Sequence, residues 1–240
     1  MKLEFLIEGK APSPHLGIVN GYIQEGINQV SLIELVTVSR DEFSEDDLEQ
    51  MVGKPATLKL KEVVDGEYMT SRFDGIIYEF HEMDPYAVES GSYIYRIIIR
   101  PKVWGMHIGN NARSFRDKTR IEVIKEVLEG FGLAKGVEFE SKYFKEDAYL
   151  KLDQILQCEI SDWAFVLQML QETGINYCFI APKDDSSNEM LYLINNEALF
   201  PKGFTSVIPW NPSREMTDGR AILSFETHAR TVPKKVDITA

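Results

Sequence analysis

The chain has 240 residues, of which 44% are hydrophobic and 27% are charged, and it carries a formal net charge of −12. These proportions are close to the globular average, so they argue against disordered and fibrous classes. The negative charge repels phosphate, which makes nucleic acid and anionic membranes unfavourable partners.

The N-terminal segment "MKLEFLIEGK" has the pattern of neither a targeting signal nor a membrane anchor. Glu4 and Glu8 interrupt its apolar run, and the sequence contains no apolar stretch long enough to span a bilayer. We therefore expect a protein made in the cytoplasm without a signal peptide and without a direct membrane anchor. Cys158 and Cys178 form no Cys-x-x-Cys pair, so we expect two buried free thiols and no zinc site.

The first hundred residues predict a β-rich unit. "KLEFLIEG" alternates apolar and polar residues, as a half-buried strand does, and "VSLIELVTV" predicts a strand covered on both faces. "ATLKLK", "SRFDGIIYEF" and "SYIYRIIIRP" bring the total to five or six strands, with a hairpin turn at Asp65–Glu67. Ile97–Ile99 suit a strand buried on both faces. Strands of this number and length predict a closed or nearly closed barrel.

One short helix interrupts these strands. In "SEDDLEQMVGKP", Ser44 is the expected N-cap, with Asp47 three residues later and acidic residues in the first turn. Gly53 and Pro55 predict its end.

The middle third has a different pattern. After the strand that Pro101 ends, we expect a long polar loop up to Thr119. Thr119 and Glu122 have capping-box spacing at the start of an amphipathic helix, "KTRIEVIKEVLEGFG". A second helix, "SDWAFVLQMLQETG", is expected to end at Gly174, and its wide apolar arc predicts packing between two neighbours. "INYCFIA" and "EMLYLIN" then predict a β-hairpin, so this segment is α+β.

Four motifs follow one another in a fixed order along the chain. They are "DLEQMVGKPATLKL", "RFDGIIYEF" with "YRIIIRPKVW", "ARSFRDKTRIEVIKEVL", and "CEISDWAFVLQMLQETGINYCF". This order resembles the VgrG spike proteins of type VI secretion and the hub proteins of contractile phage tails, over about residues 30 to 195. Two positions depart from that pattern: Asp74 stands where the family often has His, and Lys102 and Val103 separate Pro101 from Trp104.

The resemblance implies a fold and its subdivision. The expected class is α+β: a tube-type antiparallel β-barrel over residues 1–104, an inserted α+β domain over 105–200, and the start of a second β-barrel over 201–240. The resemblance also implies the residues that make up the family's structural motifs: Phe73, Gly75, Arg100, Pro101, Trp104, Phe115, Lys118, Glu159, Asp162, Phe165, Gly174 and Tyr177. Trp104 is expected either to fill the seam between barrel and insert or to be an ordinary core aromatic.

The function implied by the resemblance is structural. The chain would be a hub of a contractile injection machine that forms a homotrimer and adapts a six-fold tube to a three-fold spike. Its partners would be the tail tube ring, a spike tip or needle polypeptide and baseplate proteins. Of bacterial or phage origin, it would be assembled into the machine and expelled on contraction.

Catalytic chemistry has no positive signal in the sequence. The four histidines, His15, His81, His107 and His228, are scattered without ligand spacing, and we expect no cofactor and no metal. The alternative function is a carbohydrate-binding or hydrolytic β-barrel. That alternative would need an exposed aromatic platform and two separated carboxylates in one cleft. With only three tryptophans in the chain, no such platform is evident.

Overall fold

The computed structural model describes most of the chain in six long segments and three short ones. They are residues 2–7, 16–64, 67–83, 91–141, 149–180 and 189–196, followed by 210–211, 213 and 221–227. The predicted second barrel, 201–240, and the turn residues 65–66 and 181–188 therefore lie wholly or mainly outside the described residues. Within the last forty residues the structure describes one short parallel bridge, between Trp210 and Ile222.

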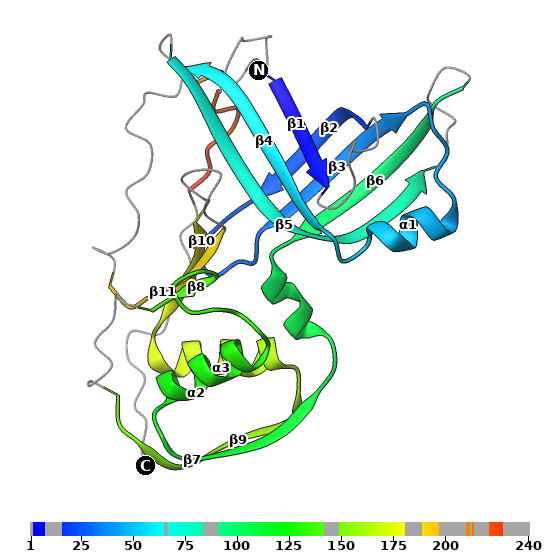
Figure 1. Ribbon diagram of the computed structural model, residues 1–240. Helices are drawn as coiled ribbons and strands as arrows, with labels where there is room; N and C mark the ends of the chain where they lie inside the picture. The colour runs from blue at the N-terminus through cyan, green and yellow to red at the C-terminus, as the bar shows by residue number, and fades with distance from the viewer. Residues whose placement is uncertain are drawn as a thin grey trace.

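The first unit is a six-stranded antiparallel sheet with one helix. Its elements in chain order are β1 (Lys2–Ile7), β2 (Gly17–Gln24), β3 (Leu32–Ser39), α1 (Glu45–Met51), β4 (Pro55–Val64), β5 (Glu67–Met83) and β6 (Tyr93–Arg100). The strand order is β1-β4-β5-β6-β3-β2, and the sheet curls strongly around its own core (Figure 1). The expected antiparallel barrel architecture is confirmed as a curled half-barrel whose outer strands are β1 and β2.

The core of the curled sheet comes from residues that alternate along its strands. Ile97, Ile98 and Ile99 of β6 are all buried, as their β-branched run predicts. On β3 the residues alternate between buried and half-buried, so one of its faces is covered completely and the other in part. One face of β3 packs into the core because neighbouring side chains on a strand point to opposite sides of a sheet.

Helix α1 begins with the predicted cap. The Ser44 hydroxyl accepts a hydrogen bond from the Asp47 backbone N–H at 3.2 Å, and the Asp47 carboxylate accepts one from the Ser44 N–H at 3.2 Å. This reciprocal pair satisfies two backbone donors that a helix start leaves open. Gly53 follows the helix with φ +81°, a conformation that side chains disfavour.

A short 3₁₀ helix, η1 (Lys102–His107), leads from the curled sheet to the second unit, here called the insert. The insert comprises β7 (Asn111–Lys118), α2 (Arg120–Gly130), β8 (Phe139–Glu140), β9 (Leu152–Ile160), α3 (Asp162–Thr173), β10 (Asn176–Ile180) and β11 (Met190–Ile194). Helices α2 and α3 lie side by side between the small sheet β10-β11-β8 and the ribbon β7-β9 (Figure 1). Buried residues from all these elements form one core.

The helices and hairpin of the insert confirm the sequence predictions. Thr119 caps α2 through a capping box with Glu122, and α3 ends at Gly174 with φ +68°. Helix α3 buries Trp163, Phe165 and Val166 among others, as its wide apolar arc predicts. Strands β10 and β11 pair antiparallel.

Other expectations for this region are wrong. The segment from Pro101 to Thr119 is not a loop: it forms η1 and then β7, which pairs with β9 about forty residues later. Polar alternation concealed β7, because only Phe115 and the partly buried Arg113 and Lys118 turn inward. Cys178 is buried, but Cys158 is exposed on the outer face of β9.

None of the helices in the described segments is both long enough and apolar enough to cross a membrane.

Candidate functional site

The seam between the curled sheet and the insert brings together four of the predicted motif residues: Gly75, Arg100, Pro101 and Trp104. Strand β6 ends at Arg100, and the buried Pro101 starts η1 with its carbonyl accepting from the Trp104 N–H at 2.9 Å. The Arg100 guanidinium lies 4.1 Å from the centre of the Trp104 ring, a cation–π contact. Burial lowers the pKa of Arg100, while the charges of Glu79 and Tyr78 act in the opposite direction.

A row of aromatic rings continues from Trp104 into the insert. The Tyr78 ring of β5 lies edge-on to Trp104, with ring centres 6.0 Å apart, and the His107 ring lies 4.1 Å from Trp104. His107 is 6.1 Å from Trp163, which meets Tyr177 edge-on at 5.3 Å. Trp104 is half-buried at the seam, whereas Trp163 is 1% exposed in the insert core. The row links the sheet to the insert through η1.

Gly75 and Phe73 lie on β5, where it passes between β4 and β6. A Cβ atom on Gly75 would be 2.6 Å from the Arg100 carbonyl oxygen and 2.7 Å from Ile99 Cγ2. Real Cβ atoms do not come that close, so this position requires glycine for close approach of the strands. Phe73, opposite Leu58, packs at the margin of the sheet core.

Asp162 is the centre of a partly buried polar network at the start of α3. Its carboxylate accepts from Asn111 Nδ2 at 2.8 Å, from Gln157 Nε2 at 2.9 Å, and from Arg113. Arg113 Nε also donates to Gln157 Oε1 at 2.9 Å, and Gln157 is only 1% exposed. The network ties the ribbon β7-β9 to the N-terminus of α3, where a negative charge is favourable.

The charge of Asp162 is stabilised by these contacts. Burial alone would raise the pKa of the carboxyl, but hydrogen bonds from Gln157 and Asn111 and the Arg113 charge outweigh it and lower the pKa. Asp162 is therefore ionised throughout the neutral range, and the network is a structural element of the insert.

The remaining motif residues support the insert by packing or by backbone conformation. Phe115 of β7 stacks on Phe165 of α3 at 5.9 Å, and Lys118 pairs with Glu126 of α2. Glu159 is exposed, but its φ of +51° turns the chain from β9 toward α3. None of these arrangements brings a nucleophile to a base.

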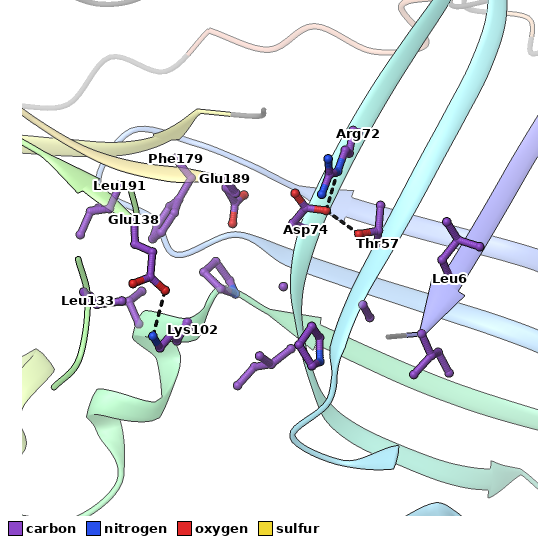
Figure 2. A pocket seen from close by; sticks show the side chains of 17 residues that line it. Leu6, Thr57, Arg72, Asp74, Lys102, Leu133, Glu138, Phe179, Glu189 and Leu191 are labelled. Carbon is purple, nitrogen blue, oxygen red and sulfur yellow. Dashed lines mark hydrogen bonds and ion pairs between the residues drawn. The ribbon is translucent and has the colours of Figure 1, made fainter. Parts of the chain in front are cut away.

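An open cleft of about 670 Å³ lies between the curled sheet and the insert. Figure 2 shows Asp74 on its sheet side, where one carboxylate oxygen accepts from Thr57 Oγ1 at 2.6 Å and Arg72 Nε at 2.9 Å. Glu189 lies on the insert side, and burial, followed by the charges of Glu25 and Asp74, raises its pKa well above the usual range.

The cleft is a junction between the two units, lined by residues of both. Its cations are already paired, Arg72 with Asp74 and Lys102 with Glu138 at 2.9 Å each. Within the described segments no group of three or more His, Cys, Asp or Glu side chains could hold a metal ion. His81 is exposed on β5, and His15 and His228 lie outside the described residues.

Sequence reasoning missed the residue that joins the two units from the side of the sheet. Asn28, in the turn between β2 and β3, makes hydrogen bonds to Asn176 and Tyr177, almost 150 residues later. Sequence patterns did not indicate Arg113 and Gln157 either. Their local sequence gives no signal, because the partners that explain them come from distant strands.

Comparisons with known proteins agree with this architecture. Residues 24–240 match the family model described as phage tail baseplate hub (GPD). No curated protein sequence matches the chain significantly.

Solved structures give the same indication. The E. coli c3393 protein, described as a component of the type VI secretion system with similarity to T4 bacteriophage tail proteins, aligns with a TM-score of 0.68 at 14% identity. That alignment covers 87% of this chain and 52% of the E. coli protein, so the chain spans about half the length of that protein. A Francisella PdpA–VgrG complex aligns with a TM-score of 0.57 at 11% identity, covering 76% of this chain and 28% of that one. At these identities the likeness shows the fold.

Proposed function

The chain belongs to the phage tail baseplate hub family, and from that premise we propose that it is a structural hub of a contractile injection machine, forming a homotrimer that adapts a six-fold tube to a three-fold spike. The observation that carries the proposal is the match of residues 24–240 to the hub model, together with a curled antiparallel sheet joined to an α+β insert. In this role the protein acts through its shape and surfaces, and it is no enzyme.

The curled sheet has edges suited to assembly. Among the described strands, β1 and β2 are the outer members of the sheet, and an outer strand presents backbone groups that another chain can pair with. Strand β2 is largely exposed on both faces, with Val19 at 66% and Tyr22 at 56% exposure. Exposed apolar side chains on an open edge favour a strand-to-strand or tube-ring contact over a free surface.

We propose the tail tube protein, a spike tip or needle polypeptide and baseplate proteins as partners. The hub would act through its shape: the trimer of hub chains presents a ring on which the first ring of tube protein stacks. The hub would be assembled into the machine in the producing cell and expelled on contraction. The family match and the fold favour this role over a carbohydrate-binding or hydrolytic barrel.

Tube nucleation tests the proposal. The complete gene product would be mixed with purified tail tube protein from the same gene cluster, and tube growth followed by light scattering and electron microscopy. We expect shortened lag times and tubes with the hub at one end only. Unchanged lag times with no end-bound hub would contradict the proposal. A control with Glu129→Gln, on an exposed position of α2 far from the sheet edges, should nucleate like the parent.

A further inference from the structure

The turn between β2 and β3 holds the edge of the insert's small sheet. Asn28 N donates to the Tyr177 carbonyl at 2.8 Å, and Asn28 Oδ1 accepts from the Tyr177 N–H at 3.0 Å. Asn28 Nδ2 also donates to Asn176 Oδ1 at 2.7 Å. One residue of the first unit therefore takes both backbone groups of Tyr177.

Those backbone groups would otherwise face outward. Strand β10 is an outer member of the sheet β10-β11-β8, and alternate residues of an antiparallel strand direct their N–H and C=O away from the paired neighbour. Asn28 occupies this edge in place of another strand. Its backbone is left-handed, with φ +58°, a conformation that asparagine tolerates better than most residues.

The turn is built to present Asn28 in this way. Gln24 Nε2 donates to Gln29 Oε1 at 3.2 Å across the turn, which braces it from within the first unit. Val30, at the end of the same turn, packs against the core of the insert. The contact therefore includes an apolar part beside its hydrogen bonds.

The side chain of Tyr177 is also fixed in place. It is 4% exposed and lies against Trp163, from which the aromatic row leads back through His107 to Trp104 and η1. Within the described segments the insert is thus attached to the first unit through η1, which continues the chain, and separately through the Asn28 turn. Two attachment points fix an orientation that one flexible link would leave free.

We propose that Asn28 is the latch that fixes the orientation of the insert relative to the curled sheet. Without its side chain the insert turns about η1 while both units stay folded. The latch is a positioning residue for the hub, because three copies can form one symmetric ring only if each holds its insert at the same angle. It acts within a single chain and does not depend on trimer formation.

Distance measurement between two spin labels tests the latch. One label is attached to Cys158, which is exposed on the insert, and the other to Glu49→Cys on the exposed side of α1. Cys178 is buried, and burial raises the pKa of its thiol, so it reacts slowly with the label. Labelled chains are diluted with unlabelled ones so that only distances within one chain are read.

Asn28→Gly is the informative variant. It removes two of the three hydrogen bonds while glycine still adopts the left-handed turn. We expect one narrow distance peak in the parent and loss of that peak in Asn28→Gly. Asn28→Asp keeps the acceptor for the Tyr177 N–H and should retain the peak. Ile27→Ala shortens a side chain that is 55% exposed in the same turn, leaves both the Asn28 contacts and the Gln24–Gln29 hydrogen bond in place, and should behave like the parent.

Three outcomes would overturn the proposal. The first is an unchanged narrow peak in Asn28→Gly, and the second is equal loss of the peak in the control Ile27→Ala. The third is loss of the distance peak accompanied by loss of the near-ultraviolet dichroism to which Trp163 contributes. The insert would then have unfolded instead of turned.

Discussion

Replacing Gly75 by alanine probes the tight crossing of β5 and β6 that shapes the curled sheet. The new Cβ would be 2.6 Å from the Arg100 carbonyl oxygen and 2.7 Å from Ile99 Cγ2, both well inside contact distance. One of these atoms belongs to the backbone of a paired strand, so relief requires moving the strand. Overpacking of a well-packed region costs about 1–3 kcal/mol, and a backbone clash places this variant at the upper end, about 2–3 kcal/mol.

Urea denaturation followed by far-ultraviolet dichroism measures this cost. At an ordinary dependence on urea, a loss of 2–3 kcal/mol lowers the midpoint by roughly 1 M. Of the three tryptophans, Trp104 lies at the seam, Trp163 in the core of the insert and Trp210 in the last forty residues, and none lies in the curled sheet, so tryptophan fluorescence follows parts of the chain other than the sheet. The sheet transition should move more than the Trp163 signal.

Gly17→Ala is the matched control. Its Cβ would be 3.2 Å from Val38 Cγ1, a half-buried side-chain atom of β3 that can move, and not from backbone of a paired strand at clash distance. Removing a glycine also restricts the unfolded chain, a gain of about 0.4–1 kcal/mol that offsets this contact. Gly17→Ala should therefore stay within about 1 kcal/mol of the parent. Equal stability of Gly75→Ala and the parent would refute the close-approach argument.

Three further substitutions test the insert. Asp162→Asn should cost about 1–3 kcal/mol at pH 7, because it leaves the Arg113 charge without its carboxylate. Because the folded state lowers the pKa of Asp162, the ionised carboxylate stabilises the folded protein fully above the unfolded-state pKa, and this stabilisation is lost as the pH falls through the lower folded-state pKa. The urea midpoints of parent and variant should therefore converge in acid. A difference in midpoint that stays constant with pH would contradict this. Trp163→Ala should cost about 3–5 kcal/mol and abolish the near-ultraviolet dichroism of the insert. A retained native signal would mean that Trp163 is not central to the core of the insert. Thr119→Ala should cost about 1 kcal/mol in thermal unfolding through the lost hydrogen bond to the Glu122 N–H, and no change in melting temperature would count against the cap.

The parts of the fold that the sequence predicts are those with local causes. Helices α1 and α2 begin at capping boxes whose two members lie three residues apart, and α3 ends at a left-handed glycine. Periodicity also gives strands β1, β3, β4, β5 and β6 and the β10-β11 hairpin. In each case the deciding interactions lie within about one turn or one hairpin of sequence.

The parts that were not predicted depend on distant partners. Strand β7 is polar and becomes a strand only because β9 pairs with it, Phe115 opposite Ile155. Strand β2 likewise contains Gly17, Asn20 and Gly21 and is ordered by pairing with β3. Alternation of apolar and polar residues identifies the two faces of a strand but does not show whether the sheet closes on itself. The half-barrel therefore could not be distinguished from a closed barrel by sequence.

The candidate site divides in the same way. Asp162, Gly75 and Arg100 could be selected because they lie in motifs whose order resembles the hub family. Asn28 and Gln157 could not, because their roles come from contacts with residues on other elements. The sequence thus indicates which residues belong to a motif, while the fold is needed to show which residues each of them contacts.

The oligomeric state of the complete gene product tests the central claim most directly. Multi-angle light scattering at micromolar concentration, with a dilution series, gives the mass of the assembly without any partner. The hub account predicts three times the chain mass, stable on dilution through the micromolar range. A single species at the mass of one chain would contradict it.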